Sequence, residues 1–222
     1  MALAPIFPII HPILKRIFPN CLWTGDINRR EIALTFDDGP HPQHTPKLLK
    51  VLEQNQIKAS FFLLGLLVHS YPQITKDIYE NGHWIGLHGY AHKSFPLLTQ
   101  KELKLSLENT ENSIYQACGL APELICDVRP PNGIITSHQL NLLTAWNYRP
   151  VMWSVVPEDW AKPGVSKVTN RVIKQTVNGS IIVLHDGYYG GEDVALSAAT
   201  IIPILLDKGY KFVTIDRMWQ QV

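Results

Sequence analysis

The sequence predicts an α/β fold in which about seven parallel strands alternate with helices and close into a barrel. Apolar runs of strand length alternate with amphipathic stretches from Glu31 to the end of the chain. Strands that are apolar throughout are typical of a parallel sheet with both faces covered. Polar residues follow several of these runs directly, and the carboxyl ends of barrel strands converge on one rim. No glycine-rich phosphate loop follows the first strand, so an open doubly wound sheet is the less favoured alternative.

Each expected strand is a short apolar run bounded by turn residues. The strands are expected at residues 32–36, 58–64, 83–88, 124–128, 149–155, 180–185 and 211–215. Amphipathic spacing predicts helices at residues 46–54, 71–80, 100–118, 138–146, 165–177 and 194–207. Thr99 is the expected N-cap of the longest helix, and Gly119 is expected to end it in a left-handed conformation.

The composition describes an ordinary folded chain with an almost balanced charge. The 222 residues are 45% hydrophobic and 18% charged, with a formal net charge of +1. A chain without a strong overall field is not expected to bind nucleic acid, and a neutral or mixed-charge substrate suits it better. Three cysteines at unrelated spacings indicate free or buried thiols, not a disulfide framework.

Residues 1–30 are predicted to form an apolar, proline-rich arm before a single domain at 31–222. Residues 1–14 contain no Lys, Arg, Asp or Glu and are interrupted by three prolines. The basic pair Lys15-Arg16 follows the apolar stretch, whereas a secretory signal carries its positive charge before it. The stretch is also too short and too rich in proline for a membrane span. An arm packed on the domain surface is favoured over the alternative, a peripheral membrane contact.

Two adjacent carboxylates, Asp37 and Asp38, end the first expected strand. Neighbouring strand residues normally point to opposite sides, but at a strand end leading into a loop both can turn into one site. Gly39-Pro40 follows them directly, so an ordinary turn is the alternative interpretation of this stretch.

His88 and His92 lie four residues apart, just after the third expected strand. On one helical turn such a pair faces the same way and can share a metal ion. Zinc or a similar divalent ion would accept both imidazoles and a carboxylate oxygen from Asp37 or Asp38. The alternative is a pair of surface or capping histidines, which the pattern alone would favour without the two carboxylates.

Five segments together resemble the motifs of the NodB-like polysaccharide deacetylases, also called carbohydrate esterase family 4. They are Thr35–Pro40 (TFDDGP), His88–His92, Arg129–Gly133 (RPPNG), Asp159-Trp160 and Leu184-His185. The resemblance runs in order from about residue 31 to residue 216, and five ordered motifs are far more specific than any one of them. It implies a distorted (β/α) barrel, which agrees with the strand pattern.

The resemblance also implies a role for each site residue. Asp38, His88 and His92 would bind the metal, with zinc favoured and cobalt, manganese or nickel as alternatives. Asp37 would act as general base and His185 as general acid. Two further residues would position them. Arg129 would orient Asp37 (a structural ion pair is its alternative), and Asp159 would hold the ring of His185.

The substrate side of the implied site consists of Pro131, Asn132, Trp160 and Leu184. A backbone N–H near Asn132 would stabilise the oxyanion, while Trp160 and Leu184 would surround an acetyl methyl group. A plain core role is the alternative for Trp160. Two residues depart from the family pattern: Gly89 stands where Ser or Thr is usual, and Asn132 stands where an aromatic residue is usual. We expect Gly89 to change loop support and Asn132 to change substrate preference.

The expected function is metal-dependent removal of N-acetyl groups from amino-sugar polymers or oligomers, with peptidoglycan or chitin-like substrates favoured over O-acetyl xylan. One alternative is a carbohydrate-binding protein that has lost catalysis, and another is a metallohydrolase for a different acyl or imide bond. Amino-sugar polymers suggest a cell envelope or periplasmic setting. The sequence carries no orthodox export signal to match it, so the compartment and the oligomeric state stay open.

Overall fold

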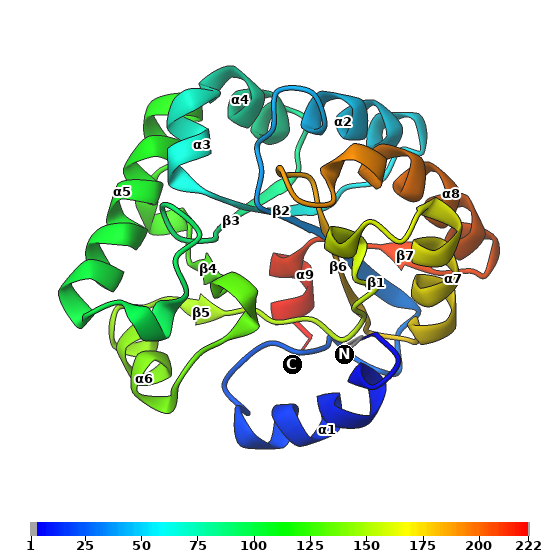
Figure 1. Ribbon diagram of the computed structural model, residues 1–222, viewed down its shortest axis with the longest axis horizontal. Helices are drawn as coiled ribbons and strands as arrows, with labels where there is room; N and C mark the ends of the chain where they lie inside the picture. Colours follow the sequence, from blue (N-terminus) through cyan, green and yellow to red (C-terminus); the bar gives the residue numbers. More distant parts are fainter. Residues whose placement is uncertain (1–3, 222) are drawn as a thin grey trace.

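A curled parallel sheet of seven strands forms the centre of the computed structural model, which describes residues 4–221 (Figure 1). The strands are β1 (Glu31–Asp37), β2 (Ser60–Leu63), β3 (Trp84–Leu87), β4 (Asp127–Val128), β5 (Arg149–Pro150), β6 (Ile181–His185) and β7 (Lys211–Phe212). Their order is β5-β4-β3-β2-β1-β6, and β7 pairs with β1. Every pairing between these strands is parallel, which confirms the predicted architecture.

Helices lie around this sheet, with one exception (Figure 1). The helices are α1 (Phe7–Ile17), α2 (Thr45–Gln54), α3 (Gly65–Ser70), α4 (Pro72–Glu80), α5 (Gln100–Cys118), α6 (Ser137–Ala145), α7 (Val165–Gln175), α8 (Val194–Asp207) and α9 (Ile215–Trp219). The exception is α9, which lies within the curl of the strands in Figure 1. The six predicted helices, α2 and α4 to α8, are confirmed within two residues at each end. Thr99 caps α5 by accepting the Glu102 N–H, and Gly119 ends it at φ 74°.

Strand β1 lies at the centre of the core because its side chains are apolar on both faces. Ile32, Leu34 and Phe36 are completely buried, and the Phe36 ring packs 5.1 Å from the ring of Phe61 on β2. The one polar side chain inside the strand, Thr35, donates its hydroxyl hydrogen to the carbonyl of Ile182 at 2.8 Å. A strand buried on both sides, with its polar group paired, gives the sheet a rigid centre.

The strands alone do not close the barrel, because no ladder joins β5 to β6 within residues 4–221. The N-terminal arm spans this gap. Leu22 donates its N–H to the carbonyl of Pro150 at 2.9 Å and accepts the N–H of Met152 at 2.8 Å. Thr24 then forms an antiparallel bridge with Ser180, just before β6 begins. Val155, beyond β5, also forms a parallel bridge with Ile182 of β6. The barrel is therefore distorted, as expected, and it is completed by residues from the arm together with Val155.

The arm also contains helix α1, which the sequence analysis did not predict. Phe7 of α1 and Trp23 belong to the main hydrophobic core cluster. Proline-rich sequence argued against a helix, but a proline in the first turn removes an N–H that would be unpaired anyway. The prediction that the arm packs against the domain holds for this part, while the division of the chain at residue 30 stays a prediction.

The fifth strand is shorter than predicted. We expected it to run over residues 149–155, but β5 contains only Arg149 and Pro150. Beyond them the carbonyls of Val151 and Met152 accept hydrogen bonds from the guanidinium of Arg129, at 3.4 and 2.9 Å. The backbone there binds a side chain of the site, so a regular ladder cannot continue.

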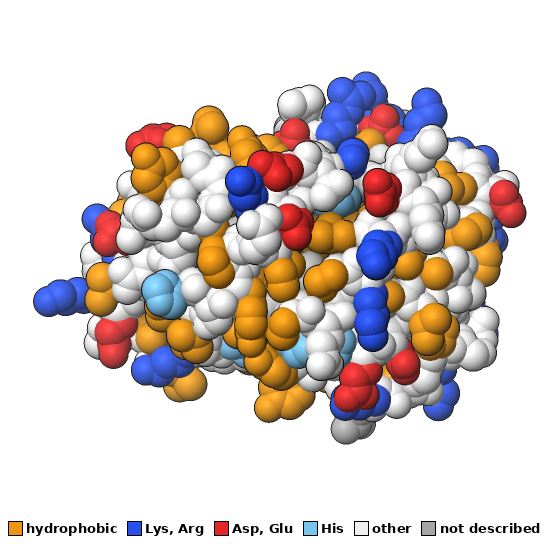
Figure 2. Space-filling view, turned by 90° about the horizontal axis from the view of Figure 1, so that it is seen from above, with side chains coloured by type: hydrophobic (Ala, Val, Ile, Leu, Met, Phe, Trp, Pro, Cys, Tyr) orange, Lys and Arg blue, Asp and Glu red, His pale blue; other side chains and the backbone are white. Residues whose placement is uncertain are grey.

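Charged side chains of both signs are mixed on the face seen in Figure 2, in keeping with the net charge of +1. Apolar side chains lie among them. Among the described residues, no helix has the length and apolar character needed to cross a bilayer.

Candidate active site

Asp37 and His185 lie side by side because two strands end at the same level. Asp37 is the last residue of β1 and His185 the last of β6, and the two are paired in register. After Asp37 the chain turns, with Asp38 in a left-handed conformation at φ 70°. This turn brings the second carboxylate to the same end of the sheet, as the sequence predicted.

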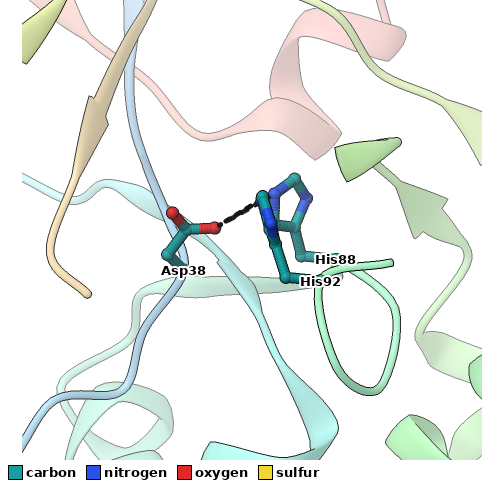
Figure 3. Close-up of side chains that lie close together, drawn as sticks. All are labelled: Asp38, His88 and His92. Carbon is teal, nitrogen blue, oxygen red and sulfur yellow. Dashed lines mark ion pairs between the residues drawn. The ribbon is translucent and has the colours of Figure 1, made fainter. Parts of the chain in front are cut away.

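Asp38, His88 and His92 form a compact group of metal-ligating side chains (Figure 3). Oδ1 of Asp38 lies 3.3 Å from Nε2 of His88 and 3.2 Å from Nε2 of His92. One ligand atom from each residue lies within 4.8 Å of the other two. Two imidazoles and a carboxylate are a ligand set typical of an open zinc site. Of the two carboxylates that the sequence offered, Asp38 is the one placed beside the histidines.

The two histidines meet through a loop, which corrects the expectation of a helical turn. Residues 88–92 have no helical structure, and His92 has a left-handed φ of 54°. Gly89 between them is left-handed too, at φ 77°, which glycine adopts without steric cost. The loop is held by the Tyr90 N–H, which donates to the hydroxyl of Ser106 at 2.8 Å. The loop has no Ser or Thr side chain at position 89, and Ser106 of α5 supplies a hydrogen bond that supports it instead.

The surroundings of this group keep its metal-facing atoms free. Nδ1 of His88 donates to the carbonyl of Arg129 at 2.7 Å, so its Nε2 carries the lone pair that faces Asp38. Oδ1 of Asp38 is buried and accepts no hydrogen bond within the part of the chain that the structure describes. Burial alone would raise the pKa of Asp38, but interactions with His88, His185 and His92 lower it to about 2. Burial also lowers the pKa of His92, against the opposing charge of Asp38.

Arg129 holds Asp37 in a buried ion pair. Nη1 of Arg129 lies 2.7 Å from Oδ1 of Asp37 and donates to the hydroxyl of Thr35 at the same distance. The guanidinium is completely buried, 4.0 Å from the ring centroid of Phe62. Burial lowers the pKa of Arg129, and the Asp37 charge opposes this. Charge, hydrogen bonds and packing together fix one oxygen of Asp37, and the orienting role that the resemblance implied for Arg129 stays a prediction.

Asp159 binds His185 at two points. Its Oδ1 lies 2.9 Å from Nδ1 of the ring, and its Oδ2 accepts the backbone N–H of His185 at 2.6 Å. Burial would lower the pKa of His185, but the charge and hydrogen bond of Asp159, with smaller contributions from Asp38 and Asp37, raise it to about 9. The ring therefore keeps its proton at neutral pH and lies beside the other site residues.

One cavity of about 450 Å³ joins these groups. Its lining residues are Asp37, Asp38, His88, His92, Asn132, Trp153, Trp160, Val183, His185 and Tyr189. The Trp160 ring meets the ring of His185 edge-on, with centroids 5.1 Å apart, as a wall of the site requires. Asn132 is left-handed at φ 61° and donates its side-chain amide to Ser94, so it lines the cavity without an aromatic platform.

Two predicted substrate-side residues do not line this cavity. Leu184 is completely buried in the main core, because neighbouring strand residues point to opposite faces and Val183 takes the inward one. Pro131 is buried and lies below the loop at Gly89.

Three residues important to the site were missed by sequence reasoning. Trp153 and Tyr189 reach the cavity from loops whose paths the sequence does not reveal. Asp186 is completely buried behind the site, where the hydroxyl of Thr45 donates to it. Burial raises the pKa of Asp186 to about 7. Its position directly after His185 was the available signal, but that dipeptide also suits a turn.

The sequence that forms this site matches a known protein family. The family model described as "Polysaccharide deacetylase" matches residues 24–151, more than half of the chain. The chain belongs to the polysaccharide deacetylase family. The resemblance to carbohydrate esterase family 4 is thereby confirmed, and the protein is a deacetylase, a hydrolase of carbon–nitrogen bonds other than peptide bonds.

Relatives of this deacetylase are similar over most of its length. A peptidoglycan-N-acetylglucosamine deacetylase of Bacillus cereus is 39% identical over 201 residues, which cover 89% of this chain and 71% of the relative. A chitooligosaccharide deacetylase of Azorhizobium caulinodans is 31% identical over 194 residues, with 82% and 91% covered. The crystal structure of the Bc1960 peptidoglycan N-acetylglucosamine deacetylase has a TM-score of 0.86 at 35% identity, with 91% of this chain and 94% of that chain covered.

A second hollow of this deacetylase, of about 530 Å³, lies along α5. It is lined by Lys104, Glu108, Trp146 and three further residues of α5. Lys104 and Glu108 form an exposed ion pair, and the hollow contains no histidine or buried carboxylate. Of these two hollows among the described residues, the smaller one, with its buried and closely spaced titratable groups, has the chemistry of an active site.

Proposed function

We propose that this deacetylase removes N-acetyl groups from amino-sugar polymers or oligomers of the peptidoglycan or chitin type. The observation that carries the proposal is the meeting of Asp37, His185 and the Asp38–His88–His92 group in one cavity of about 450 Å³. The substrates named for the Bacillus cereus and Azorhizobium caulinodans relatives support the same class. A cavity of this size accommodates a sugar ring with its acetamido group.

Asp38, His88 and His92 would hold a divalent metal ion, with zinc as the proposed identity and cobalt, manganese and nickel as alternatives. The buried, unbonded Oδ1 of Asp38 and the fixed tautomer of His88 support this assignment. A divalent ion bound there supplies Lewis-acid chemistry, since it polarises a carbonyl and lowers the pKa of a bound water from about 16 towards 7.

Asp37 would act as the general base that takes a proton from the attacking water. It lies beside the metal-ligating group but is held by Arg129, not by the histidines. Arg129 occupies one carboxylate oxygen, which leaves the other to accept the proton. Because a buried guanidinium stays protonated, Arg129 orients Asp37 without competing for that proton.

His185 would act as the general acid that protonates the leaving amine nitrogen. Asp159 occupies Nδ1, so Nε2 is the nitrogen available to donate towards the cavity. As the amide C–N bond breaks, the amine takes this proton, and the products are acetate and a free amino sugar. The raised pKa of about 9 keeps His185 in its protonated form at neutral pH.

The remaining lining residues would bind the acetamido group. Trp160 and Val183 would surround its methyl group, with Val183 in the place expected of Leu184. The backbone N–H near Asn132 would stabilise the developing oxyanion. O-acetyl xylan is the less favoured substrate, because the arrangement of His185 with Asp159 suits a leaving amine that must gain a proton.

The proposal is tested by measuring acetate release from N-acetylglucosamine oligomers, after chelation and again after zinc or cobalt is restored. We expect acetate to disappear with the chelator and to return with the metal. Absence of acetate under every metal, with the oligomer still bound, would favour a carbohydrate-binding protein. Absence of both acetate and binding would favour a metallohydrolase of a different acyl or imide bond.

The same substrate class supports a cell-envelope or periplasmic location, which we propose together with it. Fractionation of cells that produce the tagged protein, with markers for each compartment, would test this. Recovery entirely with a cytoplasmic marker would contradict the location but leave the reaction untouched.

A further inference from the structure

Helix α1 presents a ridge of isoleucines to solvent. Ile6, which caps the helix, and Ile9, Ile13 and Ile17 are 37%, 71%, 58% and 58% exposed. Their spacing of three and four residues places all four on one side of the helix. We call Ile6, Ile9, Ile13 and Ile17 the isoleucine ridge. Single exposed apolar side chains are ordinary, whereas a continuous row of them marks an interaction surface.

The opposite side of α1 is already in use. Phe7 is buried in the core, and Ile10 and Leu14 pack against it. The carbonyl of Ala4 accepts a hydrogen bond from the side chain of Gln175 on α7 at 3.4 Å. The helix is thus fastened to the barrel by one face, and it cannot turn its ridge inward without losing these contacts.

The charges beside the ridge are all of one sign. Arg16, three residues after Ile13 and seven after Ile9, is exposed on the side of the ridge, and residues 1–25 contain no aspartate or glutamate. Lys15 lies on another side of α1, where its ammonium donates to Thr24 at 2.8 Å. The solvent-facing side of this helix therefore combines aliphatic side chains with one cation and no anion. An apolar ridge with a basic border matches the boundary of an anionic bilayer, which offers acyl chains beneath negative headgroups.

We propose that α1 docks this protein on the surface of an anionic lipid bilayer. The isoleucine ridge would enter the boundary between headgroups and acyl chains, while Arg16 contacts the headgroups. A second copy of the chain fits the ridge less well. Two ridges packed together would bring the two Arg16 side chains close, with no carboxylate on either helix to neutralise them.

The position of α1 leaves the active site open. None of the residues that line the catalytic cavity comes from α1. In Figure 1 this helix lies at the edge of the molecule. Lys15 donates to Thr24, and Thr24 bridges Ser180 before the start of β6, whereas His185 lies at the other end of that strand. A docked protein would keep its cavity accessible, and the proposal does not depend on which substrate enters it.

The test is co-sedimentation of the full chain with phosphatidylcholine vesicles, with and without phosphatidylglycerol. We expect binding to the anionic vesicles, weaker binding in high salt, and little binding to phosphatidylcholine alone. The double variant Ile9→Gln/Ile13→Gln is expected to weaken binding by more than about tenfold, since each side chain loses its buried area. Arg16→Gln is expected to weaken binding to anionic vesicles by about fivefold.

The matched control replaces two exposed leucines on other helices, Leu105 on α5 and Leu196 on α8, by glutamine. The ridge variant, the Arg16→Gln variant and the control should all keep the circular dichroism spectrum and the deacetylase activity of the parent on soluble oligomers. Failure of the parent to bind anionic vesicles would overturn the proposal. Equal loss of binding in the control, or a concentration-dependent dimer that only the ridge variant abolishes, would overturn it too.

Discussion

One carboxylate, Asp159, holds both the ring and the backbone of His185. Oδ1 lies 2.9 Å from Nδ1, and Oδ2 accepts the N–H of the same residue at 2.6 Å. The ring can neither rotate nor shift along β6 without breaking one of these bonds. Asp159 therefore sets both the position and the pKa of His185. The role of the pair can be tested by measuring how activity depends on pH.

Asp159→Asn is expected to move the alkaline limb of the kcat/KM profile to lower pH. Burial lowers the pKa of His185, and the charge of Asp159 is the main cause of its rise to about 9. An amide supplies no charge, so His185 would lose its proton at lower pH, and a general acid acts only when protonated. Initial rates of acetate release across the neutral and alkaline range measure the shift. Glu108→Gln, which removes one member of an exposed ion pair on α5, is the control. If the alkaline limb of the Asp159→Asn profile does not move, the general acid is a group other than His185.

Arg129→Met is expected to destabilise the fold by about 3–5 kcal/mol, because it leaves the buried carboxylate of Asp37 without its partner. Urea unfolding followed by fluorescence measures the change. Lys104→Met removes one member of an exposed pair and should cost less than about 1 kcal/mol. Adding Asp37→Asn to the Arg129 variant should restore part of the lost stability. No restoration would mean that the loss comes from packing against Phe62.

His92→Ala and Asp37→Asn are expected to separate metal binding from catalysis. His92→Ala removes a proposed ligand and should weaken zinc binding by at least about tenfold, the loss typical even of residues that only orient ligands. Asp37→Asn should keep zinc binding and lower kcat by about a hundredfold or more. Titration calorimetry with zinc and acetate release measure the two effects. Equal loss of zinc affinity in both variants would contradict the assignment of Asp37 as a base that stays off the metal.

Tyr189→Ala is expected to raise KM for oligomeric substrates by about tenfold while changing kcat little. Tyr189 is 73% exposed and lines the cavity, so its ring offers a face to a sugar. The neighbouring Tyr188 packs edge-on against His41 and does not line the cavity, so Tyr188→Ala is the matched control. Steady-state kinetics on oligomers of different lengths would show the effect. An equal rise in KM for both variants would point to a shift of the whole loop.

The strand pattern predicted part of the site, because Asp37, Asp38 and His88 stand where buried strands end. The roles of Arg129, Asp159 and His185 were implied by the resemblance of their motifs to a family. Asp37, His88, Arg129 and His185 follow apolar runs, and parallel strands bring their carboxyl ends together. Helices with clear amphipathic spacing, such as α7, were predicted from their own residues. These features depend on local pattern, which a single sequence contains.

Features that depend on contacts between distant segments could not be predicted in the same way. Helix α3 has six residues, too few to reveal a period. Strand β5 ends early because its following carbonyls bind Arg129, which lies far away in sequence. Trp153 and Tyr189 line the cavity through the path of their loops. Val183, and not the Leu184 that the resemblance implied, lines the cavity, because alternate residues of β6 face it.

The contact between the arm and the fifth strand extends to the proposed base. Leu22 accepts the N–H of Met152, and the carbonyl of the same Met152 accepts Nη2 of Arg129, which in turn holds Asp37. One residue thus separates the arm from the guanidinium. Residues 4–24 therefore support the reacting groups indirectly. A shortened protein without them would keep every side chain of the cavity but lose the hydrogen bond from Met152 to Leu22 that supports Arg129 and, through it, Asp37.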